Sequence, residues 1–426
     1  QLADLDVSKN KTDIFSQTLE RLQSQAQLQQ HKLETGENKL EVLKDNSGKG
    51  FNRMPLPNKN DLYFDIEGDP FFDNGRLEYL FGIYFKDNQK KVFKSFWSND
   101  HQEEEKNFKN LMKFFWDHIK KHPDAYIYHY GNYEIDALRR LSTQYGVYEP
   151  ELDNLLRREK FRDLFVVTRE SIRISEPAYS IKNLETFYMK ERTQSIKSGS
   201  ESIEIFHLWL ERRNPKYLEE IEEYNKIDCI STHDLHKWLI ELRPKESSWF
   251  SSDYTEGKED EKIDEKKDWE IEFDNYKSKL SELSLKNEDK LPITTTNLLE
   301  YHNRDKKAEW WRQFDRQSKF HDELIDDNEC LAMMSMIGDP VADKRSYIYT
   351  YEYPEQDHKF KVTSEGTDLS DFKFGGTIID IDLEKRRVQL KLGKAKILGS
   401  MYTLGPKMSP TVGPLRRALY KYADDY

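Results

Sequence analysis

Short segments in which apolar and polar residues alternate follow one another in the first third of the chain. The segments DLYFDIEG, YLFGIYF and KVFKSFW predict three successive β-strands, at residues 61–68, 79–85 and 91–97. Helical periodicity over 103–121 predicts an amphipathic helix, and DAYIYHY at 124–130 predicts a further strand. Three strands followed by a helix, a strand and another helix indicate an α/β fold, a mixed sheet flanked by helices.

The pattern differs on either side of this region. Apolar residues at helical spacing predict a helix over 12–45, and strict alternation on two arms of 375–393 predicts a β-hairpin in a β-rich region. Residues 251–290 hold 14 acids and 8 lysines, which is typical of a solvated linker or a helical arm. The expected organisation is a helical leader and connector (1–58), the mixed α/β domain (59–244), a charged linker (245–291), a helical segment (292–335) and a β-rich, barrel-like domain that ends in a helix (336–426).

The composition is that of a globular protein, with 36% hydrophobic and 34% charged residues. No run approaches the roughly 18 apolar residues of a membrane span, and no signal peptide opens the chain, so we expect no membrane partner. Two cysteines, Cys229 and Cys330, without a CxxC pair fit a reducing cytoplasm better than a disulfide framework or a zinc site. Because the first residue is Gln1, we expect a fragment of a longer protein or a processed chain.

The net charge of −12 argues against a protein that covers nucleic acid without sequence specificity, but it does not exclude a local basic groove. Segment 156–197 carries 10 Lys or Arg against 6 acids, a net charge of +4. This local positive charge suits a surface that binds along a phosphate backbone. A solvated surface of mixed charge is an equally open interpretation.

Two acids, Asp65 and Glu67, interrupt the first predicted strand. Residues two apart on a strand face the same side, roughly 7 Å apart, and paired carboxylates suit a divalent cation. The same spacing at Asp380 and Asp382 is expected to be only the polar face of the hairpin. The pair in the first strand therefore needs support from other motifs.

Two later motifs supply that support. The segment YHYGNYEIDAL opens a predicted helix with Tyr133 and Glu134, and EEYNKIDCISTHDL carries Tyr224 and Asp228, which are four apart and share one face of a helix.

In this order, the motifs resemble those of the DEDD superfamily of 3′–5′ exonucleases, in its tyrosine form, on a ribonuclease H-like fold. The segments DLYFDIEGDP, YHYGNYE, YSIKNLE, YNKIDC and AEWWRQFDR are closest to the YprB-type exonuclease domain of RecB-like nuclease–superfamily 1 helicase proteins. The resemblance is strong over about 60–243 and looser on either side.

The resemblance implies an enzyme that hydrolyses phosphodiester bonds with two Mg²⁺ or Mn²⁺ ions. Asp65 would bridge both ions, and Glu67 and Asp228 would hold the first. Glu134 would orient a water on the second ion, and Tyr224 would orient the attacking water.

The second motif departs from the family pattern, because its acid is normally Asp and here is Glu134. Asp136 and Asp163 are alternative ligands. The departure also leaves open a rival function, a catalytically inactive module that binds nucleic acid or scaffolds a helicase.

The resemblance implies a single-stranded 3′ end as the substrate, with DNA favoured and RNA possible. Tyr130 and Tyr133 are candidates for stacking on bases, and Lys182 is the basic residue expected nearest the metal ions. A helicase motor and a RecB-like nuclease domain, in the same chain or in trans, are the expected partners, and the β-rich region would lead into the motor. This chain has no GxxxxGK[ST] motif, so we expect no ATP site in it.

Overall fold

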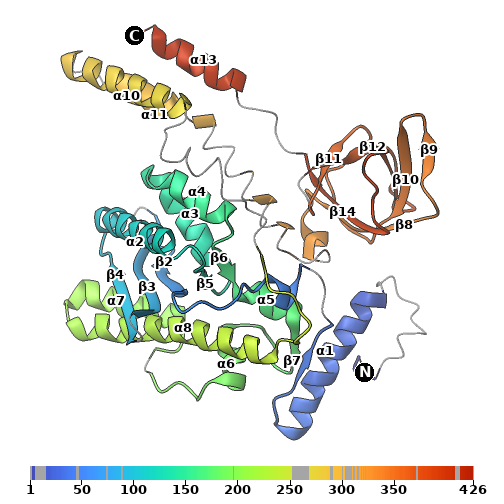
Figure 1. The fold of residues 1–426 in the computed structure, drawn as a ribbon, viewed down its shortest axis with the longest axis horizontal. Coiled ribbons are helices and arrows are strands. Elements are labelled where there is room, and N and C mark those ends of the chain that lie inside the picture. Colours follow the sequence, from blue (N-terminus) through green and yellow to red (C-terminus); the bar gives the residue numbers. More distant parts are fainter. Residues whose placement is uncertain are drawn as a thin grey trace. The chain divides into compact units, whose positions relative to one another are not determined.

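The computed structural model describes most of the chain (Figure 1). The described residues are 2–4, 16–44, 48–72, 75–87, 90–194, 196–251, 268–287, 291–299, 301–302, 309, 312–313, 316–317, 319, 321, 323–370, 373–407 and 413–425. The chain divides into two compact units, Gln1–Leu5 with Arg21–Gly257 and Asp6–Glu20 with Lys258–Tyr426.

The first unit is built on a five-stranded mixed sheet with the strand order β4-β3-β2-β5-β6. Its strands are β2 (Leu62–Asp69), β3 (Leu77–Asp87), β4 (Lys90–Trp97), β5 (Ile127–His129) and β6 (Phe161–Asp163). Strands β2, β3 and β4 pair antiparallel, whereas β5 is parallel to both β2 and β6. The three strands predicted at the start of the domain and the mixed sheet are confirmed.

Helices cover both faces of this sheet (Figure 1). They are α2 (His101–Lys121), α3 (Tyr133–Tyr145), α4 (Glu149–Arg157), α5 (Leu164–Ser171), α6 (Ile181–Tyr188), α7 (Gly199–Arg212) and α8 (Pro215–Leu242), with a 3₁₀ helix, η2, at Gly50–Arg53. The longest, α8, has 28 residues, starts at an Asn214 cap and contacts β2, β3 and β5.

Strand β2 separates an apolar face from an acidic one. Leu62, Phe64 and Ile66 are buried in one core with residues of α2, α3 and α4. Because side chains alternate along a strand, Asp65 and Glu67 face the opposite side, where α8 packs. The apolar positions therefore hold the two acids in place.

The leader joins this unit through a strand and a helix. Helix α1 (Ser16–Thr35) ends before Gly36, which has a φ of +75°, and β1 (Leu40–Val42) pairs antiparallel with β7 (Ile172–Ile174). The helix predicted over 12–45 is therefore wrong over residues 36–44, and residues 12–15 and 45 lie outside the described part.

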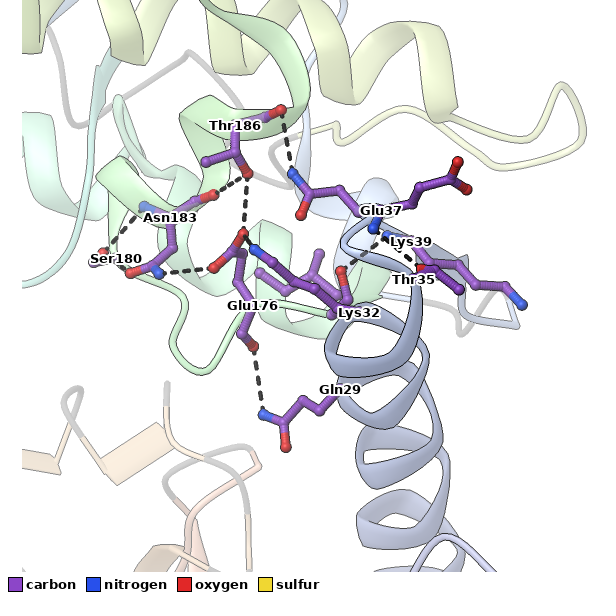
Figure 2. Close-up of polar contacts among 12 residues, drawn as sticks. Gln29, Lys32, Thr35, Glu37, Lys39, Glu176, Ser180, Asn183 and Thr186 are labelled. Atoms are coloured by element: carbon purple, nitrogen blue, oxygen red, sulfur yellow. Dashed lines mark hydrogen bonds and ion pairs between the residues drawn. The ribbon is translucent and has the colours of Figure 1, made fainter. Parts of the chain in front are cut away.

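The carboxylate of Glu176 links α1 to α6 (Figure 2). Lys32 of α1 forms an ion pair with it, and Asn183 and Thr186 of α6 donate hydrogen bonds to it at 3.2 and 3.3 Å. These contacts hold Glu176 as a carboxylate, because its pKa is lowered by Lys32 and Asn183 in spite of burial. Helix α6 carries Lys182 in its first turn, so the leader helps to position a predicted site residue.

The second unit contains a closed β-barrel, as predicted for the β-rich region (Figure 1). Its strands are β8 (Leu331–Met336), β10 (Ser346–Glu352), β11 (Glu365–Asp368), β12 (Phe374–Asp382), β13 (Arg387–Gly393) and β14 (Met401–Pro406), and a short strand β9 (Val341–Asp343) pairs with β10. All pairs are antiparallel, and pairing of β10 with β13 closes the ring.

The predicted hairpin forms from β12 and β13, and its two acids lie at the surface. Asp380 is exposed, and Asp382 pairs with Lys385 in the turn. The D-x-D spacing at this position is therefore the polar face of a hairpin.

The other described elements of this unit are helices α10 (Asp268–Asn287), α11 (Leu291–Leu299) and α13 (Gly413–Asp424) and a 3₁₀ helix, η3 (Glu323–Asp326). Part of the predicted segment 292–335, including most of AEWWRQFDR, lies outside the described residues. No helix in the described ranges is both long and apolar enough to span a membrane.

Candidate metal centre

Three carboxylates from two elements meet on the α8 side of the sheet. Oxygens of Asp65 and Glu67 on β2 and of Asp228 on α8 all lie within 4.8 Å of one another. Glu67 and Asp228 are 7% and 9% exposed, and Asp65 is half-buried. In the part of the chain that the structure describes, no other group of three potential metal ligands comes this close.

Burial and the charge of neighbouring acids raise the pKa of each of the three acids. Burial raises the pKa of Asp65 and of Glu67 well above the ordinary range, and the charge of Asp228 raises both further. Burial also raises the pKa of Asp228, although Arg192 partly offsets the effect. A divalent cation would relieve this repulsion, because it favours the ionised form of each carboxyl group.

The acid of the second motif lies apart from these three. Glu134 is 4% exposed in the first turn of α3, and its charge raises the pKa of Asp65, which places it near the cluster but outside the 4.8 Å group. Its Oε2 atom lies 3.7 Å from His129 Nδ1, which donates to the Gly131 carbonyl at 2.7 Å. That buried Oε2 atom has no hydrogen-bond partner.

Tyr224 lies one turn of α8 before Asp228, as the spacing predicted, and it is 4% exposed. Lys182 Nζ donates a hydrogen bond to its hydroxyl at 2.9 Å. Burial raises the pKa of Tyr224, and the charges of Asp228 and Glu67 raise it further. The phenol therefore stays protonated at neutral pH and can donate a hydrogen bond, but it cannot act as a base.

Asn225, which the sequence analysis did not identify, bridges α8 and β2. Its Nδ2 atom donates to Asp65 Oδ2 at 2.7 Å, and its buried Oδ1 atom has no hydrogen-bond partner. Gly82 on β3 is paired with Asp65 and lies against this amide.

The substitution Gly82→Ala is expected to displace Asn225 from Asp65. A Cβ atom at position 82 would lie 1.7 Å from Asn225 Oδ1 and 3.0 Å from a ring carbon of Phe93. Overpacking of this kind costs about 1–3 kcal/mol, so we expect a lower melting temperature and weaker Mn²⁺ binding in a calorimetric titration. Gly199→Ala is the matched control, because its Cβ would meet nothing within 4 Å. Equal melting of the two variants would contradict this role for Gly82.

Arg192, also missed from the sequence, lies against the acids. It donates to Asp228 Oδ1 at 2.5 Å and to both carboxylate oxygens of Glu185. It belongs to the basic segment 156–197, but it lies between helices, where no periodicity marks it.

The tyrosines proposed to stack on bases are half-buried and engaged in packing. The Tyr130 hydroxyl donates to the Tyr179 carbonyl, and the Tyr133 hydroxyl donates to Glu78 Oε2 at 2.8 Å. Their binding to nucleic acid stays a prediction. By contrast, Phe71, in the turn after β2, is 89% exposed. A pair of aromatic residues in the polar segment DPFFDNG was the available signal for it.

The two alternative ligands have other partners. Asp136 is exposed and lies 3.7 Å from Arg139. Asp163 caps α5 by accepting from Phe165 N, and it also accepts from Gly131 N, both at 2.8 Å.

The residues present fit a hard divalent cation. All the ligand atoms are oxygens of Asp and Glu, which suit Mg²⁺ and Mn²⁺. Two further buried oxygens, on Glu134 and Asn225, lack hydrogen-bond partners. Buried ionised carboxylates are costly without a compensating charge, which a cation would supply.

Comparison with known proteins agrees with this geometry. The family model described as the RNase_H superfamily matches residues 62–240, which contain β2 and nearly all of α8. No curated protein and no solved structure matches the chain. Residues 62–240 therefore form a ribonuclease H-like α/β domain, and nucleases of this superfamily use divalent metal ions.

Proposed function

We propose, from the ribonuclease H-like domain at residues 62–240, that this protein is a metal-dependent 3′–5′ exonuclease that degrades single-stranded nucleic acid, with DNA favoured. The observation that carries the proposal is the meeting of Asp65, Glu67 and Asp228 oxygens within 4.8 Å, one helical turn from Tyr224. The order of the motifs supports the exonuclease form and its polarity.

In this function the acids hold the cations and the polar groups position water. Asp65, Glu67 and Asp228 would hold one ion, and Glu134, outside that group, would serve a second one shared with Asp65. Two bound divalent ions polarise a water molecule and stabilise negative charge on a phosphate.

The chain's own groups orient the reactants. Tyr224 keeps its proton, so its hydroxyl can donate to the attacking water and fix its direction. Lys182 holds that hydroxyl at 2.9 Å and is itself fixed by the Lys197 carbonyl. The nucleophile is therefore oriented by a short chain of hydrogen bonds.

The substrate strand would follow the end of β2. Phe71 lies four residues beyond Glu67, so at about 3.3 Å per residue the two are at most about 13 Å apart, a distance of roughly two nucleotides. Its backbone N–H donates to Asp69 Oδ1 at 2.8 Å, and Asp69 also accepts from His207 at 2.7 Å. The turn thus holds the exposed ring of Phe71 near the proposed metal centre.

The substitution Phe71→Ala is expected to raise KM for a single strand about tenfold and to change kcat little, since stacking on a base contributes about 1–3 kcal/mol. Steady-state kinetics on an oligonucleotide checks this result. Leu33→Ala, at an 86% exposed position on α1, is the control. An unchanged KM in Phe71→Ala would exclude this contact.

A second candidate function is a catalytically inactive module that binds nucleic acid or scaffolds a helicase. The pairing of Arg192 with Asp228 at 2.5 Å favours it, because the protein already compensates part of the acidic charge without a metal. This candidate requires that Mn²⁺ does not bind at the three acids.

The resemblance of the motifs also leads us to propose a helicase motor and a RecB-like nuclease domain as partners. The closed barrel corresponds to the accessory domain that the resemblance implies, and it supports the proposal of these partners in that respect only. Two free, buried cysteines, Cys229 and Cys330, lead us to propose a cytoplasmic location.

The test compares linear and circular single strands of DNA and RNA, each with Mg²⁺, Mn²⁺ or EDTA. We expect metal-dependent release of mononucleotides from linear strands and none from circles. Cleavage of circles would show an endonuclease, and binding without any cleavage would favour the inactive module.

A further inference from the structure

The Arg192 guanidinium is fixed by a carboxylate outside the metal-binding acids. Its Nε donates to Glu185 Oε2 at 2.7 Å, and one terminal nitrogen donates to Glu185 Oε1. Glu185 is 7% exposed and accepts a further hydrogen bond from Ser231 Oγ at 2.6 Å. This two-point contact sets the plane of the guanidinium independently of Asp228.

The terminal nitrogen NH2 also reaches Asp228 Oδ1 at 2.5 Å, which brings the guanidinium to the edge of the proposed metal site. The other terminal nitrogen, NH1, is buried and has no hydrogen-bond partner. A buried donor without an acceptor is costly, so a residue that keeps one can be expected to use it in another state of the protein.

A phosphate oxygen is the acceptor that this arrangement suits. Arginine is the side chain best matched to phosphate, because its planar fork presents several donors at once and its charge does not depend on pH. Nearby, the ring of Tyr224 lies under the same guanidinium, whose carbon is 5.9 Å from the ring centroid. The tyrosine proposed to orient water and the guanidinium that carries the free donor therefore both lie close to Asp228.

We propose that Arg192 is a catalytic residue that donates NH1 to a non-bridging oxygen of the scissile phosphate, and that Glu185 is its positioning residue. This inference rests on the proposed exonuclease function. A water oxygen bonds to phosphorus as the bond to the 3′ oxygen breaks, one water proton is released to solvent, and the leaving oxygen takes up a proton. Arg192 exchanges no proton and only stabilises the charge that grows on the phosphate.

The experiment measures binding of thymidine 5′-monophosphate and of Mn²⁺ by calorimetry, together with kcat and KM. Arg192→Lys keeps the positive charge and one contact to Glu185 but loses the second terminal nitrogen, which is the proposed phosphate donor. We expect Mn²⁺ affinity within about threefold of wild type, a roughly tenfold loss of nucleotide affinity, and a kcat about a hundredfold lower. Lys190→Gln, at an exposed position two residues earlier, is the control and should match wild type.

A double variant, Arg192→Met with Glu185→Gln, removes both charges of this buried ion pair. Removing only one of them would leave an unpaired buried charge, which can unfold the protein. The double variant should lose nucleotide affinity to the same extent. Nucleotide binding in Arg192→Lys equal to that of Lys190→Gln would overturn the proposal, as would a wild type that binds no nucleotide with Mn²⁺. Wild-type binding that Arg192→Lys weakens, without any cleavage by the wild type, would support the phosphate contact and reject the exonuclease.

Discussion

The substitution Asp65→Asn is expected to abolish metal-dependent cleavage and, at the same time, to stabilise the metal-free protein. Asp65 lies among acids: burial raises its pKa, and Asp228, Glu67 and Glu134 raise it further. Asparagine is almost the same shape, can still accept from Asn225 and carries no charge. It therefore removes the repulsion together with the metal ligand.

The direction of the pH effect follows from the raised pKa. A carboxyl group whose pKa is higher in the folded than in the unfolded protein binds its proton more tightly when folded. Its contribution to stability is therefore present at low pH and is lost as the pH rises from the ordinary value of 3.8 through the raised value. The uncharged amide of the Asp65→Asn variant does not titrate, so the variant loses no stability at this position over the same range.

In EDTA at about pH 8, we expect Asp65→Asn to be more stable than wild type by on the order of 1–3 kcal/mol, and the gap to close toward about pH 4. Added Mn²⁺ should raise the melting temperature of the wild type only. Cleavage should fall by about a thousandfold or more. Asp380→Asn, at an exposed acid of the hairpin, is the control and should change neither property. A variant that melts below wild type in EDTA at this pH would contradict the account of the site.

The substitution Glu134→Gln is expected to have the second largest effect. Glu134 lies outside the group of three acids and has a buried oxygen without a hydrogen-bond partner, so the proposed function gives it to a second ion. Gln keeps the size and burial of the side chain but offers the cation no charge. We expect calorimetry to show one bound Mn²⁺ per chain where the wild type binds two, and kcat to fall about a hundredfold or more.

Two variants distinguish a metal ligand at position 134 from a side chain that only packs there. Glu134→Asp keeps the charge and should retain the second ion, because Asp is the residue that the resembled family carries. Asp136→Asn changes an exposed acid of the same helix and should leave metal binding and cleavage unchanged. Full activity in Glu134→Gln would show that Glu134 is not a metal ligand and that another group must hold the second ion.

The part of the site that local periodicity encodes could be predicted from the sequence. The period of a strand predicted that Asp65 and Glu67 face the same side, and the structure places them opposite the core that Leu62, Phe64 and Ile66 share with α2, α3 and α4. Helical spacing placed Tyr224 and Asp228 on one turn of α8 in the same way. These predictions need only the period of a strand or a helix.

The residues that were missed depend on contacts between distant segments. Asn225 reaches Asp65 only because Gly82, on another strand, leaves room for it. Arg192 lies in an irregular connection and is defined by its acceptors, Glu185 and Asp228.

The wrong prediction in the leader has the same cause. The sequence predicts helix through 45, yet Leu40–Val42 pair as a strand with Ile172–Ile174, more than a hundred residues away. Tertiary pairing of this kind overrides a local propensity, and one sequence does not reveal it.

With the acids of β2, α3 and α8 as metal ligands, the proposed enzyme removes nucleotides one at a time from a 3′ end. The most direct measurement is a time course on one single-stranded oligonucleotide labelled at its 5′ end or at its 3′ end, with Mn²⁺ or with EDTA. We expect the 5′-labelled strand to shorten through a ladder of one-nucleotide steps, and the 3′ label to be released at once as a mononucleotide, only when Mn²⁺ is present. Release of the 5′ label first, a pattern of internal cuts, or shortening in EDTA would exclude a metal-dependent 3′–5′ exonuclease.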